Sequence, residues 1–118
     1  MANETSTTEK LGANRVLEFP EGEALGTSYR WSGGPSGGQY CAIHTPNGLV
    51  GCGIYDVEVA GEFGLAVAIA KGTPEVPLCE PEDLYEAKIV ACSKPAKAMG
   101  IEPGMTGKEA VRKMLASG

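Results

Sequence analysis

A tight turn between two short apolar runs constrains the fold of this chain more than any other feature. The turn is Thr45-Pro46-Asn47-Gly48, with QYCAIH (39–44) before it and the glycine-rich LVGCGIY (49–55) after it. Asn and Gly tolerate the positive φ angles of two-residue hairpin turns. We therefore predict a β-hairpin that sets Cys41 and Cys52 on neighbouring strands, with the facing of their side chains left open.

Further apolar runs predict the remaining strands. Residues 15–19 and 24–31 lie on either side of a Pro-Glu-Gly turn and are predicted as the first two strands. The unbroken apolar run 65–70 is typical of a strand that is buried on both faces. Residues 87–91 suit either a strand or the start of a helix.

Two short helices are predicted from capping signals. Asp56 is positioned to cap a helix of two turns that ends at Gly64. Ser93, with a proline in the following turn, is positioned to cap a second helix that ends at Gly100.

The last helix is predicted from a capping box and an apolar face. Thr106 and Glu109 have the spacing at which each side chain binds a backbone N–H group of the other residue. The helix should end near Ala116. Its apolar face consists of Val111, Met114 and Leu115. Together the elements predict a small α+β domain: an antiparallel or mixed β-sheet of about five strands with short C-terminal helices.

Length and charge narrow the class of protein. The chain has 118 residues, 42% of them hydrophobic, and a net charge of −5. An acidic chain is a poor binder of phosphate backbones, so we expect no nucleic-acid partner. The polar residues 1–12 are predicted as a disordered tail before a single domain at 13–118. No secretory signal or bilayer-length apolar run is visible, so we expect a cytoplasmic protein without a membrane partner.

The four cysteines give no sign of a metal or cofactor site. Cys41, Cys52, Cys79 and Cys92 contain no Cys-x-x-Cys pair, whereas metal sites usually draw pairs of ligands from short loops. We therefore predict no metal and no cofactor, and we expect reduced thiols in a cytoplasmic chain.

Two motifs resemble those of the YunC-like family of uncharacterised bacterial and archaeal proteins. They are CGIYDV (52–57) and MGIEPGMTGKEAVRKML (99–115), and the resemblance extends over 39–115. Met99 stands where the family has leucine. The resemblance implies an α+β fold whose N-terminal β region mediates formation of a tetramer, and it implies no activity. The matching residues are Cys52, Gly53 and Asp56 in the first motif and Gly100, Ile101, Gly104, Met105, Gly107 and Glu109 in the second.

Cys52 is the candidate catalytic residue. A nucleophilic cysteine reacts as the thiolate and needs a cation, a base or a helix N-terminus to lower its pKa. Gly51 and Gly53 leave Cys52 approachable, but a nearby Asp56 carboxylate would raise the thiol pKa. His44, the only histidine, is a candidate partner if the hairpin brings it to Cys52. A buried structural cysteine is the alternative.

Three functional hypotheses follow, in descending order. The protein binds a small molecule at Cys52, Gly53 and Asp56; or it is a thiol-dependent enzyme that uses Cys52; or it has a purely structural role in an assembly. The adjacent Arg30 and Trp31 favour an interface, because both residue types are enriched there. With short edge strands, this predicts a second copy of the chain as partner in a homo-oligomer.

Overall fold

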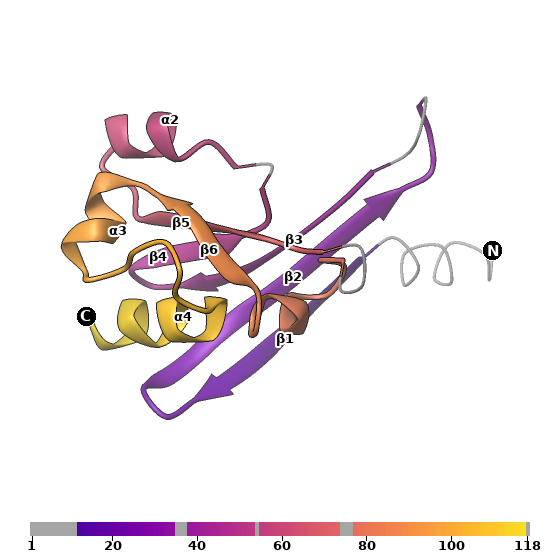
Figure 1. Ribbon diagram of the computed structural model, residues 1–118. Coiled ribbons are helices and arrows are strands. Elements are labelled where there is room, and N and C mark those ends of the chain that lie inside the picture. The colour runs from indigo at the N-terminus through magenta and orange to yellow at the C-terminus, as the bar shows by residue number, and fades with distance from the viewer. Residues whose placement is uncertain (1–11, 35–37, 54, 74–76, 118) are drawn as a thin grey trace.

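The computed structural model describes residues 12–34, 38–53, 55–73 and 77–117. The fold is α+β, as predicted, with one mixed six-stranded sheet whose strands lie side by side in chain order (Figure 1). The predicted tail at 1–12 lies almost entirely outside the described residues. The strands are β1 (Gly12–Phe19), β2 (Gly22–Trp31), β3 (Gly38–Thr45), β4 (Gly48–Gly51), β5 (Val67–Lys71) and β6 (Lys88–Cys92).

The hairpin predicted around residues 45–48 is confirmed. Strands β3 and β4 pair antiparallel, with Thr45 opposite Gly48. The Thr45 hydroxyl accepts hydrogen bonds from the backbone N–H groups of Asn47 (3.1 Å) and Gly48 (3.0 Å), which fixes the turn. The backbone N–H of Cys52 donates to the carbonyl of Cys41 at 3.1 Å, so the two cysteines are neighbours as expected.

Strand β4 is shorter than the predicted strand at 49–55. It ends at Gly51 because the chain then turns: the N–H of Tyr55 donates to the carbonyl of Cys52 at 3.5 Å, and helix α2 (Val57–Glu62) follows. This helix connects β4 to β5, which run parallel, so the sheet is mixed. The ambiguous residues 87–91 form the sixth strand, β6, antiparallel to β5.

One side of the sheet, which we call the core face, is covered. The short 3₁₀ helix η1 (Pro81–Leu84) contacts β2 and β3, and helix α4 (Gly107–Ala116) contacts β2, β3, β4 and β6. Burying apolar side chains against these elements supplies the main driving force for folding. The core-face residues include Leu17, Phe19, Ala24, Cys41, Ile43, Val50, Ala68, Ala70, Ile89 and Cys92.

Helix α4 has the predicted cap and apolar face. The Thr106 hydroxyl accepts from the N–H of Glu109 at 3.2 Å, and the Glu109 carboxylate accepts from the N–H of Thr106 at 3.0 Å. Val111 and Met114 are fully buried, and Leu115 is partly buried.

Helix α3 (Lys94–Ala98) starts where predicted but is held differently. Ser93 occupies the cap position, and its side chain makes no capping hydrogen bond. Instead the buried hydroxyl donates to the carbonyl of Leu65 (2.7 Å) and accepts from the N–H of Val67 (2.9 Å). The hydroxyl is therefore used to attach β6 to the start of β5. Gly100 ends the helix in a left-handed conformation (φ +89°), as predicted.

The other side of β1, β2 and β3, which we call the open face, carries exposed apolar side chains. Side chains alternate between the two faces of a strand, so the neighbours of core residues Leu17 and Ala24 point to this side. The ends of β2 and β3 extend beyond the helices (Figure 1). The exposed apolar residues of the open face are Val16, Leu25, Tyr29 and Trp31.

Candidate functional site

The residues of the first sequence motif form the corner between β4 and α2. Its described members are Cys52, Gly53, Tyr55 and Asp56, and we refer to them as the corner. Cys52 closes the strand, Gly53 is exposed in the turn, and Asp56 is the residue before the helix. Tyr55 packs over Gly51, and Asp56 is used as the cap of α2.

Cys52 belongs to the hydrophobic core. Its exposed fraction is 7%, and it lies beside Cys41, which is fully buried. Burial raises the pKa of the Cys41 thiol to about 12, and the neighbouring Cys52 adds to the effect. Among the described residues, no lysine, arginine or histidine side chain is hydrogen-bonded to Cys52. The arrangement in the described residues is that of a packed thiol without a hydrogen-bonded cation, which is the kind of partner that activates a nucleophilic cysteine.

His44 is not brought to Cys52. It pairs with Leu25 on β2 and Leu49 on β4, one residue out of phase with the core-face residue Ile43. Its side chain therefore points to the open face, while Cys52 points to the core face. The His44 Nε2 atom lies 3.1 Å from the Thr27 hydroxyl oxygen, which is its hydrogen-bonding partner.

Asp56 caps α2, as the sequence predicted. Its Oδ1 atom accepts from the backbone N–H groups of Glu58 (2.9 Å) and Val59 (3.2 Å). Such a cap satisfies donors that have no partner inside the helix and fixes where the helix begins. The helix ends before Gly64, whose φ is +74°.

Gly51, just before the corner, explains part of the motif's glycine content. A Cβ atom placed there would lie 2.5 Å from the Tyr55 ring, which packs over the bare backbone. Gly53 has open space around it instead, with nothing within 4 Å of an added Cβ.

The second motif is also built into the fold. Ile101 is buried in the core, and Gly104 has a φ of +98° that favours glycine. A Cβ on Gly107 would lie 2.0 Å from the Leu84 carbonyl oxygen, so only glycine fits between α4 and η1. Glu109 completes the capping box, and the Thr106 hydrogen bonds hold the pKa of its carboxyl below the ordinary value.

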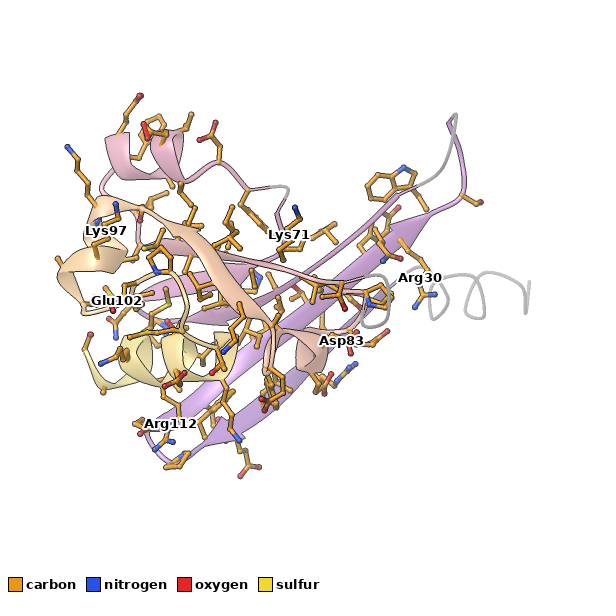
Figure 2. The ribbon with its side chains drawn as sticks, in the orientation of Figure 1. Arg30, Lys71, Asp83, Lys97, Glu102 and Arg112 are labelled. Atoms are coloured by element: carbon orange, nitrogen blue, oxygen red, sulfur yellow. The ribbon has the colours of Figure 1, made fainter. Side chains whose placement is uncertain are left out.

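A recess lies between α2 and the segment at β6 and α3, next to the corner. Its volume is about 240 Å³. Lys97 projects from α3 in Figure 2 and is part of the lining. The lining residues are Val57, Glu58, Gly61, Glu62, Cys92, Ser93, Lys94 and Lys97.

Sequence reasoning missed this recess, although a signal was present. Glu58 and Glu62 are four residues apart, and Lys94 and Lys97 are three apart, so each pair shares one face of its helix. What the sequence did not reveal is that the two faces meet in space.

The expected interface residues Arg30 and Trp31 point to opposite sides of the sheet. Arg30 Nη2 lies 3.4 Å from a Glu80 carboxylate oxygen on the core side. Trp31 lies on the open face and stacks on Tyr29, with ring centroids 5.8 Å apart.

The described part of the chain offers neither a metal-binding cluster nor a membrane-spanning helix. No three His, Cys, Asp or Glu side chains there are grouped so as to hold a metal ion. None of the helices in these residues has the length and apolar character needed to span a lipid bilayer.

Comparisons with known proteins agree with this fold. The crystal structure of TA1206, a protein of unknown function from Thermoplasma acidophilum, is similar with a TM-score of 0.67 at 19% sequence identity. The similarity covers 88% of this chain and 93% of that chain, and at this identity it shows the fold alone. No curated protein matches the chain. Residues 51–114 match the family described as a domain of unknown function, DUF1805. Because this match covers more than half of the 118 residues, the chain belongs to the DUF1805 family.

Proposed function

We propose that this protein is a cytoplasmic, YunC-like homo-oligomer that binds a small molecule beside the corner. The observation that carries the ligand-binding proposal is the recess between α2 and α3, which adjoins the helix that Asp56 begins. Small-molecule sites are concave and have polar groups that converge on the ligand, and the polar side chains of this recess are placed around such a hollow. Cys52 and Asp56 then serve to place α2, rather than to touch the ligand.

This proposal is tested by NMR titration of the protein with a panel of organic acids, amines, amino acids, sugars and nucleosides. At least one class should shift the backbone amide resonances of Gly61 and Ser93, which line the recess. The resonance of Gly34, on a distant loop, serves as the internal control. If no class moves the recess resonances, the binding hypothesis fails.

The proposed homo-oligomer is supported by the open face. Val16 and Leu25 pair across β1 and β2 and are 59% and 43% exposed, and Tyr29 and Trp31 continue the apolar surface. Thr27 separates Leu25 from Tyr29 along β2, so the open face carries two exposed apolar groups. Exposed apolar groups gathered on one face of a sheet support an interaction site.

Charge on the same side of the sheet favours a second copy as the occupant. Glu18 and Glu23 pair at the end of the sheet where β2 begins. Lys71, out of phase with the core residue Ala70, lies at the opposite end, where β5 ends. In a two-fold contact, the acidic end of one copy meets the lysine end of the other twice.

The assembly is tested by light scattering coupled to size-exclusion chromatography. Leu25→Glu should convert the oligomer to a smaller species, since it places a charge in the apolar pair that Val16 and Leu25 form on the open face. Phe63→Ser is the matched control, because Phe63 is 74% exposed and follows α2. A Leu25→Glu protein that is folded by circular dichroism and keeps the wild-type mass contradicts this interface.

The thiol-enzyme hypothesis, using Cys52, is the runner-up. Its support is the position of Cys52 at a strand end between two glycines. The 7% exposure and the absence of a hydrogen-bonded cation in the described residues weigh against it. Alkylation of the native protein at neutral pH separates the hypotheses: a Cys52 that reacts no faster than a free thiol removes the support for a nucleophile.

A further inference from the structure

The recess between α2 and α3 has one acidic wall and one basic wall. Glu58 and Glu62 lie on α2, and Lys94 and Lys97 lie on α3. Among the described residues, none of these four side chains forms an ion pair or a side-chain hydrogen bond. The ion pairs formed by the described residues lie elsewhere in the molecule, and all of them use an arginine: Arg15, Arg30 or Arg112. The two glutamates and two lysines, all exposed, therefore line the recess with no ion pair between its two walls in the described residues.

The surface between the two walls is uncharged. Val57 is apolar, and Cys92 is buried with its thiol donating to the carbonyl of Ile101 at 3.5 Å. Burial raises the pKa of the Cys92 thiol, and the charges of Lys97 and Glu102 act on this pKa in opposite directions. A ligand in this recess would meet a charged group at each end and an uncharged group in the middle.

We propose that the recess binds a small zwitterion, an aminocarboxylate whose ammonium and carboxylate groups are separated by a short hydrocarbon chain. Its carboxylate pairs with Lys94 and Lys97, its ammonium with Glu58 and Glu62, and its hydrocarbon lies against Val57. This inference rests on the proposed ligand-binding function and names the ligand class. The volume of about 240 Å³ corresponds to roughly eight water molecules at ~30 Å³ each, which limits the ligand to a similar number of heavy atoms.

The wall charges select against simpler ligands. A dicarboxylate would place one negative group beside the two glutamates, and a diamine would place one positive group beside the two lysines. Like charges brought together in this way disfavour binding. Only a ligand that carries both signs is attracted by both walls.

The test is isothermal titration of the full chain with 4-aminobutanoate, compared with butanoate and butylamine. The zwitterion should bind about tenfold or more tightly than either single-charge compound, because it makes both charge contacts. Lys97→Gln and Glu62→Gln should each weaken its binding about fivefold, the size expected for a partly exposed charge pair. Lys113→Gln, on α4 and outside the recess, is the matched control and should bind like the wild type.

A further variant tests binding in the recess by blocking its space, without changing any charge. Gly61 lies in α2, and an added Cβ would be 3.8 Å from the nearest atoms, so a side chain enters the recess without a clash at its base. Gly61→Leu should remain folded and lose binding of 4-aminobutanoate. Equal binding of the three probes, no binding of 4-aminobutanoate, or unchanged binding by Gly61→Leu would each overturn the zwitterion inference. If another class from the NMR panel shifts the recess resonances, the proposed function stands and this inference alone fails.

Discussion

The two faces of the β1–β2 hairpin both carry apolar residues, but these residues are buried on one face and exposed on the other. Leu17 on the core face is 6% exposed, whereas its neighbour Val16 on the open face is 59% exposed. Ala24 is 5% exposed and Leu25 is 43% exposed. The exposed fractions differ because η1 and α4 contact β2 from the core side and leave the open side uncovered. Exposed apolar residues gathered on one uncovered face mark an interaction site, and this is the basis of our proposal that a second copy covers the open face.

The same comparison separates the residues of the sequence motif. Cys52 is packed into the core, and its neighbour Gly53 is exposed. The Oδ1 atom of Asp56 accepts the hydrogen bonds that cap the start of α2. A motif that looked like a ligand site in the sequence is therefore divided between the core, a turn and a helix cap. The recess beside it takes its charged residues from other positions.

The largest expected effect distinguishes the two faces directly. Met114→Ala removes a fully buried side chain from α4 and should lower the free energy of unfolding by about 2–5 kcal/mol. Leu25→Ala is the open-face counterpart and should cost less than about 0.5 kcal/mol in the monomer. Urea denaturation measures both variants.

Protein concentration sharpens this prediction. If a second copy covers the open face, the cost of Leu25→Ala should rise with protein concentration, because assembly stabilises the folded state by mass action. The cost of Met114→Ala should persist at the lowest concentration. Similar costs for the two variants at every concentration would contradict the distinction between a covered and an open face.

Local signals in the sequence predicted the local structure well. The turn at 45–48, the Asp56 cap and the Thr106–Glu109 capping box each depend on residues within a few positions of one another. Such elements are encoded by turn and cap chemistry, which requires no knowledge of the rest of the chain. The number of strands was underestimated because residues 88–92 are short and equally suited to a helix.

The long-range arrangement of the strands and helices could not be predicted from the sequence. The parallel pairing of β4 and β5 depends on the path of α2 between them. The facing of His44 depends on the hairpin register, and a shift of one residue would have placed it on the core face. The recess joins residues 57–62 to residues 92–97, which are at least 30 positions apart, so no local pattern reveals it.

The second prediction concerns the close packing of the Tyr55 ring on the backbone of Gly51. Gly51→Ala places a Cβ 2.5 Å from the Tyr55 ring, so the ring must move, at a cost of about 1–3 kcal/mol. Gly53→Ala is the matched control, since it meets nothing within 4 Å and should change stability by about 0.5 kcal/mol or less. Thermal or urea unfolding measures both.

A double-mutant cycle identifies the cause. In a Tyr55→Ala background, Gly51→Ala should cost clearly less, because the ring that it displaces is gone. If the two effects simply add, the packing of Tyr55 on Gly51 is not the reason for glycine at this position.

The third prediction separates the cap role of Asp56 from a role for its charge. Asp56→Ala removes the acceptor for two backbone N–H groups and should lower stability by about 0.5–2 kcal/mol. Asp56→Asn should cost little, because asparagine caps as well as aspartate. Urea denaturation measures the stability, and circular dichroism shows whether α2 is retained. An Asn variant as unstable as the Ala variant would show that the carboxylate charge is needed.

The smallest expected effect concerns the ion pair that ties β1 to η1 on the core side. Arg15 Nε donates to a Glu82 carboxylate oxygen at 2.8 Å, and this hydrogen bonding holds the pKa of Glu82 below its ordinary value. A carboxyl whose pKa is lowered by folding stabilises the fold above its unfolded pKa of about 4.3, and it loses that contribution as pH falls through the lower folded pKa. Both side chains are more than a third exposed, so the contribution is about 0.2–1 kcal/mol.

Glu82→Gln should therefore lower stability at pH 7 and flatten its decline below about pH 4.5. Glu86→Gln, an exposed residue after η1, is the control for the acid titration measured by urea denaturation at each pH. Equal slopes for wild type and Glu82→Gln would show that this pair adds nothing to the attachment of β1, which would then depend on apolar packing and on the remaining Arg15–Glu80 pair.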